Sequence, residues 1–325
     1  MNFQLKILVL SFVVSVIFGI IVIPILRRCK VGQIERDDGP ESHLKKAGTP
    51  TMGGIIMALA AVVCSGLLFF QYRTTEPKVA FNILALVFVT LGFGLVGFVD
   101  DFKKLVLKNT KGLSPMLKMF GLLIISVAYV IYLIKFGNIG TDTYIPILKQ
   151  YISIPIWAYI PFAIFVMLGT TNAVNLTDGI DGLSSSVTTI ILTSLVSISI
   201  ILGITEVTVV GTVLIGACLG FLIFNLHPAK VFMGDTGSLM LGGAIAGIAL
   251  YMKMPLILIV IALVPIIETL SVMIQVAHFK RTGKRVFKMA PIHHHFELSG
   301  WKEGKVVTVF SFITLVLCII GMNII

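Results

Sequence analysis

Carboxylates stand in two short segments where their spacing could do chemistry. Asp100 and Asp101 are adjacent at the end of an apolar stretch, and Asp235 directly precedes another. Two carboxylates at the C-terminus of a helix oppose its dipole and repel each other, so this placement costs stability and indicates a site. Oxygen ligands of this kind suit Mg²⁺. The structural alternatives are a helix end paired with Lys103 or Lys104, and an N-cap role for Asp235.

A third polar segment, residues 171–183, lies between two apolar stretches. Asn175, Asp178 and Asp181 follow one another at intervals of three, and Asn172 precedes them by the same interval. Residues three apart share one face of a helix, so a helical segment would present its oxygen atoms to one hard cation or polar ligand. A turn rich in Asx caps is the alternative.

Basic and imidazole side chains accompany these segments. Lys46 precedes Gly-Thr-Pro-Thr-Met-Gly-Gly, which predicts either the edge of an anion site or a tightly packed helix entry with Thr49 or Thr51 as cap. Three successive imidazoles, residues 293–295, cannot all reach one metal from regular backbone, so they are expected to bind phosphate or orient a carboxylate. Glu268 lies inside an apolar stretch and should face the protein interior, with Gln275 on nearly the same face.

The composition shows what must position these groups. Of 325 residues, 57% are hydrophobic and 12% are charged, and the mean hydropathy is +1.04. Such a chain is neither a soluble cytosolic enzyme, a disordered protein nor a disulfide scaffold. We predict an all-α, polytopic membrane protein with one catalytic domain, residues 1–325. Ten stretches are long enough to span a bilayer: 5–26, 51–71, 79–99, 119–135, 153–172, 183–203, 207–226, 236–252, 255–278 and 304–324.

The basic residues predict the orientation of these spans. Nineteen of the 25 Lys and Arg residues lie in segments that follow odd-numbered spans, which places those segments in the cytoplasm and both termini outside. All the polar motifs lie on this inner side, whereas the outer loops are short and nearly featureless. The net charge of +10 follows from this bias and does not indicate nucleic acid as a partner. Because the carboxylates gather at one face and no repeat is visible, a secondary transporter or channel is disfavoured.

Five motifs in a fixed order resemble the polyprenyl-phosphate sugar-1-phosphate transferases, in particular their muramoyl-pentapeptide branch. They are Lys-Lys-x-Gly-Thr-Pro-Thr-Met-Gly-Gly (45–54), Asp-Asp-x-x-Lys (100–104), Asn-Ala-Val-Asn-Leu-Thr-Asp-Gly-x-Asp-Gly-Leu (172–183), Phe-Met-Gly-Asp-Thr-Gly-Ser (232–238) and Pro-Ile-His-His-His-Phe-Glu (291–297). The resemblance covers essentially the whole chain. It implies a Mg²⁺-dependent transfer from UDP-N-acetylmuramoyl-pentapeptide to undecaprenyl phosphate, giving lipid I and UMP, in the bacterial cytoplasmic membrane. A UDP-N-acetylglucosamine enzyme of the same superfamily is the alternative.

The resemblance also implies roles for individual residues. Asp235 is the expected Mg²⁺ ligand, supported by Asp101, and Asp100 the base or charge partner of the lipid phosphate, although the two adjacent residues could divide these roles in either order. Phe232 would stack on uracil. His293, His294 and His295 would close the site over the sugar phosphate. The remaining residues expected to bind substrate are Lys46, Thr51, Lys104, Lys108, Lys118, Asn172, Asn175, Asp178, Asp181, Asn225, Gly234, Ser238, Glu268 and Gln275.

The sequence leaves open the mechanism of transfer, the role of three lysines and the state of assembly. A lipid phosphate has a second pKa near 6 and is largely dianionic at neutral pH, which favours its direct attack on the β-phosphorus over a covalent aspartyl intermediate. The lysines at 108, 111 and 118 could instead meet anionic lipid headgroups. A homodimer is one assembly compatible with this sequence.

Overall fold

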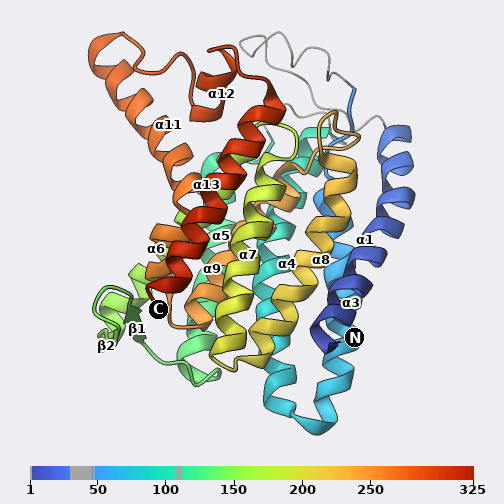
Figure 1. The fold of residues 1–325 in the computed structure, drawn as a ribbon, viewed down its shortest axis with the longest axis vertical. Coiled ribbons are helices and arrows are strands. Elements are labelled where there is room, and N and C mark those ends of the chain that lie inside the picture. Colours follow the sequence, from blue (N-terminus) through green and yellow to red (C-terminus); the bar gives the residue numbers. More distant parts are fainter. Residues whose placement is uncertain (1, 30–45, 47, 106, 108–111) are drawn as a thin grey trace.

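The protein is a bundle of long helices (Figure 1). The computed structural model describes residues 2–29, 46, 48–105, 107 and 112–325. This architecture confirms the predicted all-α, polytopic fold. The long helices are α1 (Phe3–Arg28), α3 (Gly54–Thr75), α4 (Pro77–Leu105), α5 (Pro115–Lys135), α6 (Ile156–Thr177), α7 (Leu183–Ile201), α8 (Thr205–Asn225), α9 (Gly234–Tyr251), α11 (Leu263–Thr282) and α13 (Glu303–Asn323); short helices are η1 (Pro255–Ile257), α10 (Leu258–Ile261) and α12 (Ile292–Glu297).

The number of spans differs from the prediction of ten. In the described part of the chain, nine helices are long and apolar enough to cross a membrane. The predicted span 236–252 forms helix α9, but this helix has only 18 residues and carries polar and glycine residues. It is buried from Thr236 to Tyr251 because other helices enclose it. A helix that does not face lipid needs no continuous apolar surface. Hydropathy alone therefore did not distinguish the enclosed helix α9 from the helices that face lipid.

The predicted span 255–278 is interrupted. Residues 255–261 form η1 and α10, and α11 starts only at Leu263, after a break at Ala262 (φ −107°, ψ 23°). In one continuous helix the ring of Pro265 would collide with the carbonyl of Ile261, four residues earlier, whereas in the first turn of a new helix proline is tolerated. Helix α11 then projects away from the bundle and ends at Thr282 (Figure 1).

The connection between α5 and α6 contains a feature that the sequence did not predict. Strands β1 (Asp142–Ile145) and β2 (Gln150–Ser153) form an antiparallel hairpin in which Asp142 faces Ser153 and Ile145 faces Gln150. The expectation of nearly featureless loops was therefore wrong here. Four-residue strands are too short for a reliable alternation of polar and apolar residues, which explains why the pattern was missed.

Glycines allow α4 and α9 to lie in close contact. A Cβ atom at Gly97 would stand 2.1 Å from the carbonyl oxygen of Asp235, and one at Gly94 would stand 3.1 Å from Cβ of Met240. Gly54 of α3 meets Gly237 of α9 in the same way, at 2.2 Å. Because no side chain separates these helices, the end of α4 that carries Asp100 is held beside the start of α9.

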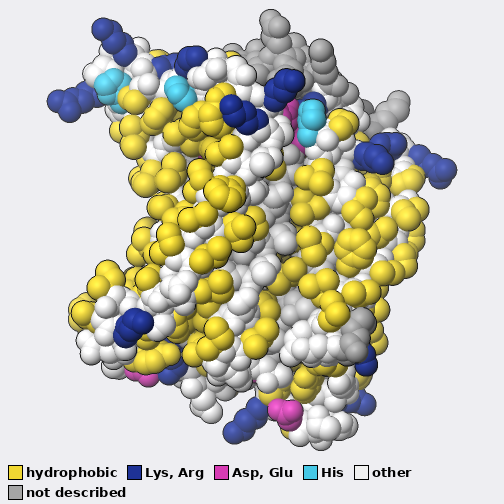
Figure 2. All heavy atoms as spheres, viewed as in Figure 1, with side chains coloured by type: hydrophobic (Ala, Val, Ile, Leu, Met, Phe, Trp, Pro, Cys, Tyr) yellow, Lys and Arg dark blue, Asp and Glu magenta, His cyan; other side chains and the backbone are white. Residues whose placement is uncertain are grey.

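The surface separates apolar and charged side chains (Figure 2). Hydrophobic side chains cover the middle of the face in view, and Lys and Arg lie mainly at its two ends. This face is hollowed between the projecting α11–α12 region and the hairpin. The many exposed large apolar residues, among them Phe70, Phe88 and Phe165, suit a surface where lipid replaces water. We call the end with Asp100 and Asp235 the charged end, and the other the opposite end.

Candidate active site at the charged end

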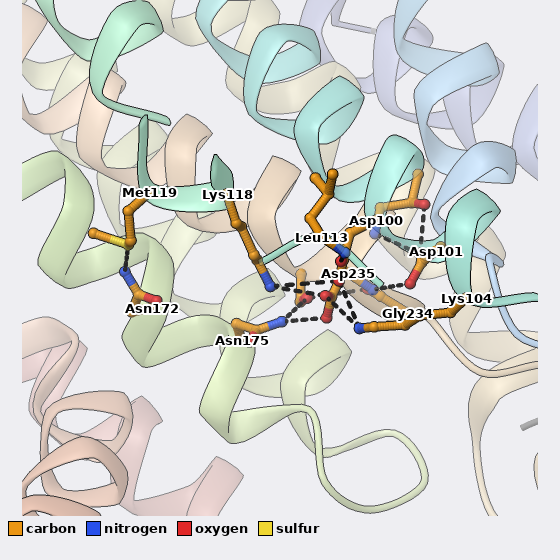
Figure 3. A network of polar contacts seen from close by, with 12 residues as sticks. Asp100, Asp101, Lys104, Leu113, Lys118, Met119, Asn172, Asn175, Gly234 and Asp235 are labelled. Carbon is orange, nitrogen blue, oxygen red and sulfur yellow. Dashed lines mark hydrogen bonds and ion pairs between the residues drawn. The ribbon is translucent and has the colours of Figure 1, made fainter. Parts of the chain in front are cut away.

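Two helices bring three carboxylates together at the charged end (Figure 3). Asp100 and Asp101 lie in the last turns of α4, and Asp235 lies in the first turn of α9. One oxygen atom from each of the three lies within 4.8 Å of the others. Residues separated by more than 130 positions thus form one acidic cluster, which we call the carboxylate cluster.

Two lysines neutralise part of this cluster. Nζ of Lys104 lies 2.5 Å from Asp100 and 3.2 Å from Asp235, and Nζ of Lys118 lies 2.7 Å from Asp235 and 3.9 Å from Asp100. The backbone N–H of Leu113 donates to Oδ1 of Asp100 at 2.7 Å. Ser114 caps α5 and fixes the turn that carries Lys118. Both predicted lysines therefore bridge Asp100 and Asp235.

Asp101 has a structural role as well. Its carboxylate accepts the backbone N–H groups of Asp235 at 3.2 Å and Thr236 at 2.9 Å, and the Thr236 hydroxyl at 2.7 Å. It thereby satisfies free donors in the first turn of α9, where negative charge is favoured by the helix dipole. Asp101 caps α9 from α4 and holds Asp235 in place, whereas Asp100 faces the lysines.

The 171–183 segment also contacts the carboxylate cluster. The amide of Asn175, in α6, donates to Oδ1 of Asp235 and to the Ser238 hydroxyl, both at 2.8 Å. Asp178 lies just beyond the end of α6 and accepts a hydrogen bond from the backbone N–H of Gly234. Desolvation, and then the charges of neighbouring carboxylates beginning with Asp235, raise the pKa of Asp178 to about 8.

Backbone pairing fixes the Gly-Thr-Pro-Thr segment. The N–H of Phe232 donates to the carbonyl of Pro50 at 2.8 Å, and the N–H of Gly53 donates to the carbonyl of Phe232 at 2.8 Å. Helix α3 begins at Gly54 without a side-chain cap, so the expected capping by Thr49 or Thr51 is wrong. Thr51 is instead buried against Gly234, whose φ of 72° requires glycine at this turn.

Several predicted site residues lie away from the carboxylate cluster. Lys46 pairs with Asp181 and Glu303, and the amide of Asn172 donates to the carbonyl of Leu168, 2.7 Å away within its own helix. Figure 3 shows Asn172 beside Met119, apart from Asn175. The Asn172 amide also lies 3.7 Å from the sulfur of Met119, so neither of these contacts involves the carboxylate cluster. Lys108 lies outside the described residues.

Two further amides stabilise loops. Asn225 is buried, accepts from the Ser185 hydroxyl at 2.6 Å and donates to the carbonyl of Val231 at 3.0 Å. Gln275 accepts the backbone N–H of Val286 at 2.9 Å and also bonds both backbone groups of Phe287 at 3.0 Å. Since these bonds use both the oxygen and the nitrogen of each amide, the structure gives the two residues a loop-holding role.

The three histidines of α12 diverge. His293 is fully buried, with Nδ1 3.1 Å from Oε2 of the equally buried Glu268, and its ring packs on Gly179, where a Cβ would lie 2.1 Å from Nε2. His294 bonds Glu297 at 2.7 Å, and Nδ1 of His295 accepts the N–H of Lys288 at 3.1 Å. The three imidazoles thus contact three different partners. His293 ties α11 and α12 to the loop between Asp178 and Asp181.

The sequence reasoning missed two polar residues. Glu303 opens α13 and is buried, and His227 follows the end of α8. Both lie beside Asp181, and with it they form a second group of ligand atoms within 4.8 Å of one another. The signal was present: each begins or ends a helix on the side that the basic residues assign to the cytoplasm. Glu303 was not singled out because an acidic residue at the start of a helix has an ordinary explanation as a partner of the helix dipole.

The carboxylate cluster suits a divalent cation and phosphate groups. Three carboxylates from two helices can offer oxygen atoms to a hard cation, and Asp235 keeps partial exposure. The lysine ammonium groups that now neutralise Asp100 and Asp235 are the groups that phosphate oxygens would attract. The arrangement can therefore hold an anionic ligand together with a metal at the end of a membrane bundle.

Comparison with known proteins identifies the family of this chain. The chain matches the Glycosyl transferase family 4 description over residues 83–253, and the phospho-N-acetylmuramoyl-pentapeptide-transferase signature 1 over residues 46–56. It is 50% identical to the phospho-N-acetylmuramoyl-pentapeptide-transferase of Acetivibrio thermocellus, over 96% of this chain and 92% of the relative. The enzyme of the same name from Clostridium perfringens is 51% identical over 97% and 96%, and that from Halalkalibacterium halodurans 48% over 93% and 91%. The chain belongs to the phospho-N-acetylmuramoyl-pentapeptide-transferase family and is a transferase.

Proposed function

We propose that the protein transfers phospho-N-acetylmuramoyl-pentapeptide from UDP-N-acetylmuramoyl-pentapeptide to undecaprenyl phosphate, giving lipid I and UMP, with Mg²⁺ as cofactor. The observation that carries this proposal is the carboxylate cluster with Lys104 and Lys118 at the end of a lipid-facing bundle. One substrate is a soluble polyanion and the other a lipid phosphate. A site at the membrane boundary that combines two lysines with candidate metal ligands would be accessible to both.

The roles of individual residues follow from their contacts. Asp235 and Asp101 would hold Mg²⁺, with Asp100 as the third carboxylate of the group. The bound ion would supply positive charge to the diphosphate. Lys104 and Lys118 would neutralise the phosphates as the reaction proceeds, because phosphoryl transfer is catalysed mainly by positioning and charge stabilisation.

Asp100 has contacts that favour a role as charge partner over one as nucleophile. Its Oδ1 accepts from Leu113 and its Oδ2 pairs with Lys104. A carboxylate so engaged is a poor nucleophile, whereas it orients Lys104 well. Direct attack by the dianionic lipid phosphate on the β-phosphorus is therefore our mechanism, with Asp100 positioning the phosphate-binding lysine.

The nucleotide would lie beside the carboxylate cluster. Phe232 is partly exposed, and Nζ of Lys46 lies 6.0 Å from the centre of its ring. An aromatic ring next to a cation suits a stacked pyrimidine base joined to a diphosphate. We assign Phe232, Lys46 and Asp181 to the uridine end of the substrate.

The test is a substrate-omission experiment with the purified protein in detergent. UMP and a lipid-linked product should appear only when UDP-N-acetylmuramoyl-pentapeptide, undecaprenyl phosphate and Mg²⁺ are all present. UDP-N-acetylglucosamine in place of the muramoyl nucleotide is the matched control and should give no product. Equal use of both nucleotides would contradict the proposed specificity. A burst of UMP near one equivalent without lipid would replace direct attack by a covalent intermediate.

We further propose that the protein lies in the bacterial cytoplasmic membrane with the charged end toward the cytoplasm. The asymmetry of Lys and Arg supports this orientation. Cysteines introduced at Lys230 and Lys284 should react with a membrane-impermeant maleimide only in opened cells, whereas a cysteine at Lys149, beside the hairpin, should react in intact cells. The reverse pattern would invert the orientation.

A further inference from the structure

A second group of charged side chains lies outside the carboxylate cluster. Nζ of Lys46 lies 2.7 Å from Oδ1 of Asp181 and 2.6 Å from Oε2 of Glu303. Nδ1 of His227 lies 3.0 Å from Oδ2 of Asp181 and 3.6 Å from Glu303. We call these four residues the Lys46 node. They come from four separate segments: the chain before α3, the loop before α7, the turn after α8 and the start of α13.

The Lys46 ammonium is the cation at the centre of the Lys46 node. The Lys46 ammonium occupies the space between the two carboxylates, and the side chains of Asp181 and Glu303 are only 3% and 7% exposed. Burial lowers the pKa of Lys46, but hydrogen bonds to Asp181 and Glu303 outweigh this effect and raise it. The ammonium therefore stays charged at neutral pH and pairs with both carboxylates.

The two carboxylates of the Lys46 node are held in different ways. Asp181 is held independently, because its Oδ2 accepts the backbone N–H of Ala229 at 3.1 Å as well as facing His227. Glu303 pairs with Lys46 and lies near His227. A lysine side chain is long and rotates freely, so one carboxylate alone would leave its ammonium mobile. Two carboxylates from opposite sides fix it in one place.

We propose that Glu303 is a positioning residue for the uridine nucleotide, acting through Lys46. Glu303 holds the Lys46 ammonium in the position that faces Phe232, with the Nζ atom 6.0 Å from the ring centre. The start of the last helix thereby sets the affinity for the nucleotide without touching the carboxylates that face the phosphates. This inference rests on the proposed function, which assigns Phe232 and Lys46 to the uridine end.

Steady-state kinetics with the full-length protein test this proposal. Glu303→Gln should raise KM for UDP-N-acetylmuramoyl-pentapeptide about tenfold, while kcat and KM for undecaprenyl phosphate change less than about twofold, since one charge-assisted hydrogen bond at the nucleotide end becomes neutral. Glu303→Asp keeps the charge and should restore part of the affinity. Glu76→Gln, at an exposed acid of the opposite end, is the matched control and should change nothing.

A double-mutant cycle shows whether Glu303 acts through Lys46. In a Lys46→Gln background, Glu303→Gln should raise the nucleotide KM by less than about twofold further. Multiplicative effects of the two substitutions would overturn the proposal, as would an equal rise in KM for both substrates or a loss of kcat alone. A merely structural role would give one of these patterns, because loss of folded enzyme lowers the apparent kcat without separating the substrates.

UMP titration separates this proposal from the proposed function. Binding of UMP, followed by calorimetry, should weaken about tenfold in Glu303→Gln and recover in Glu303→Asp. If the wild-type protein makes no lipid-linked product, the proposed function fails while the UMP titration still judges the Lys46 node. If the wild type turns over and UMP binds both proteins equally, the role of Glu303 fails and the proposed function stands. Should Glu303→Gln not fold, Glu303→Asp and Lys46→Gln supply the same comparison.

Discussion

The two ends of the α4–α9 helix pair carry polar groups that are arranged in different ways. At the charged end, Asp100 and Asp101 of α4 meet Asp235 of α9. At the opposite end, Asn82 of α4 and the hydroxyl of Tyr251 of α9 both donate to the carboxylate of Glu206, the Asn82 bond being 3.0 Å long. The two helices thus contribute three carboxylates to the charged end. At the opposite end both of them bond the single carboxylate of Glu206, which belongs to α8.

The difference lies in how the charge is satisfied. Glu206 receives neutral donors, and Asn82 is itself held by the Tyr132 hydroxyl at 2.8 Å, so four helices are joined without like charges in contact. In the carboxylate cluster, like charges are adjacent, and the ammonium groups of Lys104 and Lys118 offset only part of them. Repulsion of this kind destabilises a fold unless a bound cation relieves it, and it therefore marks a binding site. The opposite end is built for cohesion and the charged end for a ligand.

The largest expected effect is at Asp235. Asp235→Asn should reduce turnover by at least about 10³-fold, because it removes the carboxylate that both lysines and Asn175 contact. UMP release measures the loss. The thermal unfolding temperature should change little, because the repulsion from Asp100 and Asp101 and the attraction of Lys104 and Lys118 disappear together. A variant that unfolds at markedly lower temperature would mean that Asp235 is structural, which would remove the contrast between the two ends.

Lys118 should come next. Lys118→Gln should lower kcat/KM about 10- to 100-fold, because a charge-assisted contact to anionic groups is worth roughly 1.5–3 kcal/mol. Lys103→Gln is the matched control: it changes a neighbouring lysine for which the structure shows no ion pair with Asp100 or Asp235, and it should stay within about twofold. Equal losses in both variants would reduce these lysines to a basic patch that meets lipid headgroups.

The opposite end should respond in stability and not in activity. Tyr251→Phe removes one donor to Glu206 and should lower the free energy of unfolding by roughly 1–3 kcal/mol. Thermal unfolding in detergent measures this change, and KM for both substrates should remain unchanged. A shift in either KM would show that the hydrogen-bond network at the opposite end is coupled to the charged end.

The smallest effect concerns pH. The pKa of Asp178 is raised to about 8, so the folded protein holds this proton between the unfolded value of 3.8 and about 8 while the unfolded chain loses it. Stability should therefore decrease as pH rises through this window. Unfolding temperatures measured from pH 5 to pH 8 without divalent ions should fall less steeply in Asp178→Asn than in the wild type. Identical slopes would show that Asp178 is already ionised at neutral pH.

The sequence predicted the bundle because hydropathy acts locally. Each lipid-facing helix must be apolar over its own length, so spans such as 5–26 could be recognised without knowledge of their neighbours. The helix that only other helices contact, α9, deviates from this rule, and the break at Ala262 depends on how Pro265 fits a turn. Asp100 and Asp101 were also singled out locally, since adjacent like charges at a helix end repel each other and oppose the helix dipole.

Only the tertiary structure decided which charges meet. Lys46 was expected at the phosphates, yet it pairs with Asp181 and with Glu303, 257 residues away. Asn172 and Asn175 are three apart on one helix, but only Asn175 reaches Asp235 because the start of α9 lies beside that turn alone. The order of residues determines what each segment can offer. Packing determines the partner, because an ion pair or hydrogen bond exists only over the few ångströms at which two segments are held.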